Sequence, residues 1–233
     1  MYTIDSPFLN LQQSSIDWLY RYEPILDFLV VHELLNADIL DYGCGNIGLG
    51  SVFNGKYFGI DINPIVPEVA NLTPIHHVHP YDLEKTFDVV CAVDVLEHIP
   101  LPERGLFFMT MRRITRRHLI LTFPTREAGY QLDVETGMFL DSQGRLPDWL
   151  LEHLSLQHPG VDEIVKLACD SGFKMTSRLM NTHRIMHYLG CIGIHVSGPL
   201  KVKLLNEIHY LNVLHSQESA LDMYRAILFL EVA

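Results

Sequence analysis

Short apolar runs alternate along most of the chain with stretches whose apolar residues recur at helical spacing. This alternation is typical of strand–helix–strand units, which build a mostly parallel sheet with helices on its faces. The apolar runs predict seven strands, at residues 37–42, 57–61, 74–79, 87–93, 118–123, 173–179 and 225–232. Helical periodicity predicts helices at about residues 47–53, 64–70, 101–116 and 148–171.

The remaining segments lie before the first strand and in two long connections. Apolar residues at helical spacing predict one or two helices within about residues 8–36. Residues 124–147 and 180–224 exceed ordinary connections, and loops of such length usually form lids, binding loops or interfaces. Because no linker divides the chain, we expect a single α/β domain over residues 1–233, with an inserted helical segment at about 181–224.

The charge balance limits the classes of partner. The 233 residues carry a formal net charge of −11, and the 17 basic residues form no long run. Since Lys and Arg neutralise phosphates in nucleic-acid complexes, we expect no nucleic-acid partner. The 4 cysteines form no paired motif, and we find neither a leader nor a membrane-spanning apolar stretch. We expect a cytoplasmic protein without stable membrane insertion.

A glycine-rich loop, "DYGCGNIGLG", follows the first predicted strand. Gly43, Gly45 and Gly48 match the G-x-G-x-x-G pattern that several classes of nucleotide-binding protein share. Glycine lets the chain turn sharply and approach a ligand closely, and a following helix offers unpaired N–H groups. Asp61 ends the second predicted strand, where an acidic side chain can bind ribose hydroxyls or cap a helix. These features also fit a nicotinamide-dependent oxidoreductase.

Asp41 separates the candidate ligands, because a carboxylate just before the glycines would repel a pyrophosphate and attract a sulfonium or ammonium group. The stretch "ILDYGCGNIGLG" resembles the first motif, D-x-G-x-G-x-x-G, of the class I S-adenosylmethionine-dependent methyltransferases. Similarly, "YFGIDINP" resembles their second motif, and "YDLEKTFDVVCAVDVLEHIP" resembles their third and fourth motifs run together. The order and spacing of the predicted strands extend this resemblance over most of the chain.

The resemblance implies a Rossmann-like three-layer sandwich, with a seven-stranded, mostly parallel sheet and an antiparallel last strand. It also implies S-adenosylmethionine as the cofactor. The candidate cofactor-binding residues are Asp41, Gly43, Gly45, Asn46, Asp61, Ile62, Asp82, Leu83 and Asp94.

Their roles follow from the same resemblance. Gly43 and Gly45 would pass under the methionine part, and Asp41 would orient this part or the loop. Asp61 would bind the ribose hydroxyls, whereas Ile62 would pack on the adenine. Asp82, followed by Leu83, would meet the amino edge of the adenine. Asp94 would lie where the carboxyl end of the ligand meets the acceptor, or would cap the next helix.

The reaction requires few catalytic groups, because in-line displacement from a sulfonium depends mainly on alignment. His98, in "DVLEHIP", follows the fourth strand and is the candidate general base, with backbone hydrogen bonding as its structural alternative. Glu97 is interpreted as a first-turn helix residue. Glu152, His153 and His158 lie in a stretch loosely similar to methyltransferases found with bacterial surface-glycan genes. There His153 would line the acceptor pocket or pack in the core.

We therefore predict methyl transfer from S-adenosylmethionine to a small-molecule, glycan or lipid-like acceptor. The segment "HHVH" has no third ligand nearby, so we expect no metal site. The apolar insertion is expected to serve a lipid-like acceptor or a homodimer interface. A nicotinamide-dependent oxidoreductase, an aminopropyl transferase and a non-catalytic cofactor-binding scaffold stay open as alternatives.

Overall fold

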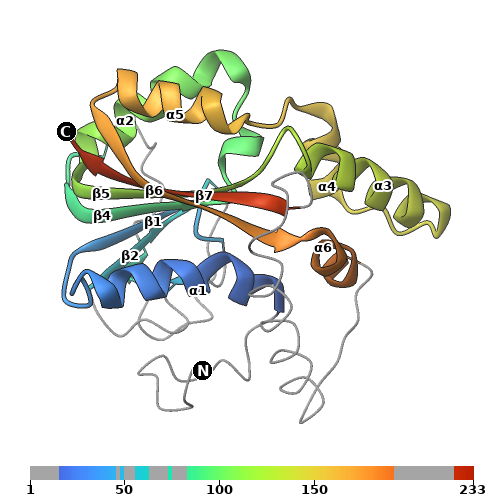
Figure 1. The fold of residues 1–233 in the computed structure, drawn as a ribbon, viewed down its shortest axis with the longest axis horizontal. Helices are drawn as coiled ribbons and strands as arrows, with labels where there is room; N and C mark the ends of the chain where they lie inside the picture. Colours follow the sequence, from blue (N-terminus) through green and yellow to red (C-terminus); the bar gives the residue numbers. More distant parts are fainter. Residues whose placement is uncertain (1–15, 46–47, 50–55, 63–72, 75–82, 192–222) are drawn as a thin grey trace, which may run out of the picture.

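The centre of the molecule is a mixed α/β sheet with the strand order β3-β2-β1-β4-β5-β7-β6 (Figure 1). The computed structural model describes residues 16–45, 48–49, 56–62, 73–74, 83–191 and 223–233. The five neighbouring strands β3, β2, β1, β4 and β5 pair in parallel, whereas β7 is antiparallel to both β5 and β6. The strands are β1 Ile39–Tyr42, β2 Tyr57–Ile60, β3 Thr73–Pro74, β4 Phe87–Val93, β5 Thr115–Pro124, β6 Phe173–His183 and β7 Met223–Val232. The predicted mixed sheet with an antiparallel last strand is confirmed.

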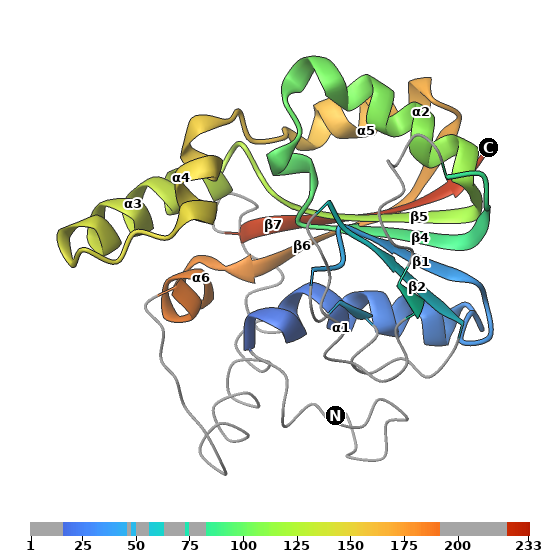
Figure 2. The ribbon, with the colours of Figure 1, turned by 180° about the vertical axis from the view of Figure 1, so that it is seen from behind.

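Helices cover both faces of the sheet and surround one of its ends (Figures 1 and 2). Helix α1 lies on one face, and α2 and α5 lie on the other. Helices α3, α4 and α6 gather at the end where the parallel strands finish. The α-helices are α1 Ile16–Val31, α2 Arg104–Ile114, α3 Gly129–Ser142, α4 Asp148–Ser155, α5 Val161–Asp170 and α6 Arg184–Cys191, and two 3-10 helices are η3 Leu96–His98 and η4 Leu101–Glu103.

The core has two parts, one on each face of the sheet. Strands β4 and β7 are buried along nearly their whole length, which is typical of strands with helices on both faces. Phe108 of α2 and Ile164 of α5 belong to the cluster on one face, and Ile25 and Leu29 of α1 belong to the other. This two-sided burial fixes the strand ends from which the site loops emerge.

Residues 124–147 do not form the long connection that the sequence predicted, because they contain α3. Leu132, Thr136 and Leu140 are all buried, and their spacing of four residues places them on one helix face. The apolar stripe is thin, with a threonine in its middle, and Gly137 lies beside it. The hydrophobic pattern therefore gave too weak a helical signal.

Residues 148–171 form two helices and not the single predicted one. Helix α4 ends at Ser155, and α5 begins at Val161 after Pro159 and Gly160. The residue before a proline avoids helical backbone, so the helix breaks there. The helix predicted at 101–116 begins instead as the 3-10 helix η4 and continues as α2, which ends at Ile114 because β5 starts at the next residue.

Several predicted elements lie wholly or largely outside the described residues. These are the helices at 47–53 and 64–70, most of the strand at 74–79, and residues 192–222 of the predicted insertion. Within the predicted insertion at 181–224, the first residues belong to β6, residues 184–191 form α6, and residues 223–224 begin β7. None of the helices in the described part of the chain has the length and apolar character that a bilayer span requires.

Asp41 fixes the glycine loop to the end of β1. Its side chain is fully buried, and its Oδ2 accepts hydrogen bonds from Leu49 N (3.0 Å) and from the Tyr57 hydroxyl (2.8 Å). A Cβ at Gly48 would lie 2.7 Å from this oxygen and 2.4 Å from the Tyr57 hydroxyl, so only glycine fits there. Trp18 Nε1 also donates to the Gly48 carbonyl at 3.0 Å. These contacts hold the glycine loop against the end of β1, and the role of Asp41 toward the cofactor stays a prediction.

Burial raises the pKa of Asp41 from its ordinary 3.8 to about 6, although the bonds from Leu49 and Tyr57 act to lower it. The carboxyl group of Asp41 therefore holds its proton more tightly in the folded protein than in the unfolded chain. Its contribution to stability is full below pH 3.8 and is lost as the pH rises to about 6. A shift of this size corresponds to about 3 kcal/mol.

We predict that Asp41→Asn removes this part of the pH dependence, because the amide does not titrate while its oxygen can still accept both hydrogen bonds. Urea unfolding of the wild type and the variant at pH 4, 5, 6 and 7 measures the effect. The stability of the variant relative to the wild type should rise with pH across this range. A difference that stays constant with pH would show that Asp41 has the same pKa in the folded and the unfolded protein.

Candidate active site

The glycine loop opens toward the end of β4. Gly43 and Gly45 both have positive φ, at 74° and 54°. A Cβ at Gly43 would meet Val95 Cγ2 at 2.5 Å, so the loop and the turn after β4 pack directly on each other. A Cβ at Gly45 would meet no atom of the described residues within 4 Å, so this position borders open space in that part of the structure. Gly43 N donates to the Ile60 carbonyl at 2.7 Å, which ties the loop to β2.

Asp61 lies beside this opening. It directly follows β2, and its Oδ2 accepts a hydrogen bond from Gly45 N at 2.9 Å. The structure thus brings together the loop glycines and the carboxylate that the sequence predicted to bind ribose.

The other predicted cofactor-binding residues differ in burial, and two of them lie outside the described residues. Ile62 directly follows Asp61 and is 86% exposed among the described residues. Leu83 is buried in the core, and its carbonyl accepts a hydrogen bond from Arg113 at 2.9 Å. Asn46 and Asp82 lie outside the described residues.

Asp94 forms ion pairs at the end of β4 and does not cap a helix. Residue Val95 holds the cap position of η3 and offers no side-chain hydrogen bond, so the capping interpretation is wrong. Arg225 of β7 donates to both carboxylate oxygens of Asp94, with Nη2–Oδ2 at 2.9 Å and Nε–Oδ1 at 3.1 Å. Arg21 of α1 approaches the same carboxylate at 3.7 Å. Two arginines therefore compensate this charge.

Arg104 holds the turn that contains η3 in place. Its side chain is fully buried and donates to the Ile99 carbonyl at 3.1 Å and to Glu163 at 2.8 Å. It also donates to the Gln157 carbonyl. One guanidinium thereby joins the turn after β4 to α5 and to the segment before it.

Glu97, on η3, is buried, and the positive charge of Arg225 offsets only part of the cost of this burial. Its side chain is 1% exposed, and neither carboxylate oxygen has a hydrogen-bond partner in the described part of the chain. Burial raises the pKa of Glu97 well above its ordinary value, and the charge of Asp94 raises it further. Glu97 does lie in the first turn of η3, as the sequence predicted, but this position alone does not account for its burial.

His98 is half-buried next to Glu97. Its Nδ1 lies 3.2 Å from Glu152 Oε2, on α4. Burial lowers the pKa of His98, as does the nearby His153, although Glu152 acts in the opposite direction. The imidazole is therefore neutral near pH 7.

A second buried carboxylate, Asp133 of α3, has many partners. Its Oδ2 lies 2.9 Å from His153 Nδ1 and 3.0 Å from His158 Nε2, and its Oδ1 accepts from the Tyr224 hydroxyl at 3.0 Å. His187 Nε2 lies 3.4 Å from Oδ1. Burial alone would raise the pKa of Asp133, but the hydrogen bonds from His153 and His158 lower it below its usual range. Asp133 is thus a buried anion.

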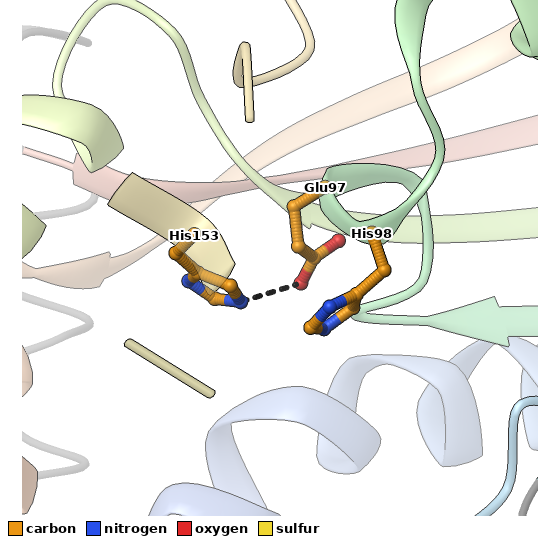
Figure 3. A group of neighbouring side chains, drawn as sticks. All are labelled: Glu97, His98 and His153. Carbon is orange, nitrogen blue, oxygen red and sulfur yellow. Dashed lines mark ion pairs between the residues drawn. The ribbon is translucent and has the colours of Figure 1, made fainter. Parts of the chain in front are cut away.

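The side chains of Glu97, His98 and His153 converge on one point (Figure 3). We call these three residues the η3 polar group. His153 Nε2 lies 3.9 Å from Glu97 Oε1, and the two imidazole rings lie 5.0 Å apart between centroids. A carboxylate and two ring nitrogens can accept protons or coordinate a cation there.

Sequence reasoning found part of this site. It singled out His98, His153 and His158, but it missed Asp133 and the pairing of Arg225 with Asp94. Asp133 lies in the segment interpreted as a connection, and no local spacing links it to histidines of α4 and α6. The signal lies only in the tertiary fold.

Comparison with known proteins agrees with this geometry. Residues 17–178 match the family model of a methyltransferase domain. None of the curated proteins matches the chain. Among solved structures, magnesium protoporphyrin IX methyltransferase from Synechocystis, with bound S-adenosylhomocysteine, superposes with a TM-score of 0.57 at 18% identity, covering 91% of this chain and 81% of the other.

Two further structures show the same fold. A putative sarcosine dimethylglycine methyltransferase from Galdieria sulphuraria has a TM-score of 0.57 at 14% identity, covering 97% of this chain and 93% of its own. An S-adenosylmethionine-dependent methyltransferase from Mesorhizobium loti has a TM-score of 0.56 at 14% identity, covering 93% and 100%. The chain therefore belongs to the methyltransferase-domain family and is an S-adenosylmethionine-dependent methyltransferase.

Proposed function

We propose that the protein transfers the methyl group of S-adenosylmethionine, by in-line displacement, to a small-molecule, glycan or lipid-like acceptor that binds at η3. The observation that carries this proposal is the contact between Gly43 and Val95. Val95 touches the glycine loop, and Glu97 and His98 follow it within one turn. The glycine loop, which would hold the methyl donor, and the η3 polar group therefore lie on adjacent parts of one site.

On the cofactor side, Gly43 and Gly45 pass under the methionine part, where the lack of side chains allows close approach. Asp61, at the rim of the opening, binds the ribose hydroxyls. The exposed Ile62 packs on the adenine. The predicted contacts of Asn46 with the cofactor and of Asp82 with the amino edge of the adenine stay predictions.

On the acceptor side, His98 is the proposed proton acceptor for the attacking hydroxyl or amine. Its lowered pKa keeps the ring neutral near pH 7, as a base requires. The contact of Nδ1 with Glu152 orients the ring.

The proposed acceptor class depends on charge. A net charge of −11 disfavours polyanionic acceptors such as nucleic acids and is compatible with neutral glycans, lipids and small molecules. Three further points stay predictions. They are a single domain over residues 1–233, a homodimer or lipid contact through the helical insertion at 181–224, and a cytoplasmic location.

Asp61→Ala is predicted to weaken binding of S-adenosylhomocysteine roughly 10- to 100-fold, because charge-assisted hydrogen bonds to the ribose are lost. Asp61→Asn separates this effect from loosening of the loop, since an amide oxygen can still accept from Gly45 N. Calorimetric titration of both variants measures the affinities, with the exposed Asp141→Ala as a control expected to bind like the wild type. Unchanged affinity in Asp61→Ala would refute the assignment of the ribose site.

His98→Ala is predicted to lower turnover by roughly 100-fold or more while the dissociation constant for S-adenosylhomocysteine changes little. The measurement is release of S-adenosylhomocysteine over a panel of hydroxylated small molecules, glycans and lipids. His32→Ala, which alters an exposed histidine near the end of α1, is the matched control. Equal loss of cofactor affinity and turnover would place His98 in the cofactor site instead.

A further inference from the structure

The η3 polar group contains an electrostatic imbalance around Glu97. A buried carboxylate without a hydrogen-bond donor is costly, because it has lost hydration and gained no partner. Both oxygens of Glu97 are in this position among the described residues. The side chain points toward the two imidazoles of His98 and His153 (Figure 3).

The imidazole of His153 faces Glu97 with a lone pair. Asp133 Oδ2 lies 2.9 Å from His153 Nδ1, and a carboxylate in this position favours the tautomer with the proton on Nδ1. The lone pair is then on Nε2, which lies 3.9 Å from Glu97 Oε1. An electropositive species, either a proton or a metal ion, therefore fits between these two atoms.

His98 is oriented in the same way. Its Nδ1 lies 3.2 Å from Glu152 Oε2, which favours a proton on Nδ1 and leaves the lone pair on Nε2. Each histidine of the group therefore has a carboxylate on Nδ1, Glu152 for His98 and Asp133 for His153. This pairing is characteristic of histidines that ligate metal ions, where the carboxylate fixes the tautomer and ring orientation.

We propose that Glu97, His98 and His153 bind one divalent transition-metal ion, and that Asp133 orients His153 as a ligand. One carboxylate and two imidazoles form a ligand set that suits Zn²⁺, Mn²⁺ or Co²⁺ better than Mg²⁺. The ion replaces the missing partner of Glu97.

The geometry requires only side-chain adjustment. One candidate ligand atom from each residue lies within 4.8 Å of the others. Metal–ligand distances of about 2.0–2.2 Å bring such atoms to roughly 3–3.5 Å from one another, so each moves by about 1 Å. His98 is half-buried and can make this movement by rotation.

A neighbouring group, Asp133 with His153 and His158, also has ligand-like spacing. Its carboxylate oxygens already accept hydrogen bonds from His153, His158 and Tyr224. An ion there would have to break these bonds. Asp133 is therefore a positioning residue for the site at Glu97.

The proposed ion also favours one class of methyl acceptor. This part of the inference rests on the proposed methyl transfer. Three protein ligands leave open positions for oxygen atoms of an acceptor, which favours a hydroxyl-bearing molecule. Coordination lowers the pKa of the hydroxyl, which releases its proton to solvent. The oxygen then forms the bond to the methyl carbon as the carbon–sulfur bond breaks and S-adenosylhomocysteine leaves. With the ion bound, His98 is a ligand, and release of the proton to solvent replaces the proton transfer to His98 that is proposed above for the reaction without a metal.

The test is calorimetric titration of the chelator-treated full-length protein with Zn²⁺, Mn²⁺ or Mg²⁺, with thermal unfolding of each variant to check the fold. The wild type should bind one equivalent of Zn²⁺ or Mn²⁺, and Mg²⁺ more weakly. Glu97→Gln, which conserves shape, and His98→Ala should each lower the affinity at least 10-fold. His32→Ala should bind like the wild type. The visible absorption of bound Co²⁺ should change in Glu97→Gln.

Two results would overturn the proposal. One is a wild type that takes up neither Zn²⁺ nor Mn²⁺. The other is a Glu97→Gln variant with wild-type affinity and stoichiometry, which would show that Glu97 is not a ligand of the ion. Titration of the same samples with S-adenosylhomocysteine distinguishes failure of the metal site from failure of the proposed function. If S-adenosylhomocysteine binds but no metal is taken up, only the metal site is overturned. If S-adenosylhomocysteine does not bind, the proposed function is overturned.

Discussion

The buried carboxylate of Asp133 is the interaction on which the acceptor end of the molecule depends. It contacts His153 of α4, His158 of the following segment, His187 of α6 and Tyr224 of β7. These elements lie far apart in sequence and surround the end of the sheet where parallel strands finish (Figure 1). One anion therefore holds four separate elements together, and its contact with His153 also fixes a side chain of the η3 polar group.

Three carboxylates near the end of β4 differ in how their charge is compensated. Asp133 has four polar partners, and Asp94 pairs with Arg225 and Arg21. Glu97 has no hydrogen-bond partner among the described residues. Glu97 therefore differs from the other two carboxyl groups, and the proposed ligand would supply the partner that it lacks. This position adjoins the glycine loop through the contact of Gly43 with Val95.

The sequence predicted those features whose determinants are local. The apolar strands, the glycine loop and Asp61 follow from short patterns, because strand burial and tight turns depend on neighbouring residues. Helix α3 was missed because its buried stripe is thin. The Asp133 network could not be predicted, since its members meet only after the chain folds. The helix-cap interpretation of Asp94 was wrong because Arg225, 131 residues away, competes for the carboxylate.

The central claim is that the glycine loop and the η3 polar group form one active site. A crystal structure with bound S-adenosylhomocysteine tests it most directly. We predict the ribose hydroxyls on Asp61 and the sulfur atom above Gly43 and Gly45, directed toward Glu97 and His98. A ligand whose sulfur points away from η3, or that does not contact Asp61, would contradict the account.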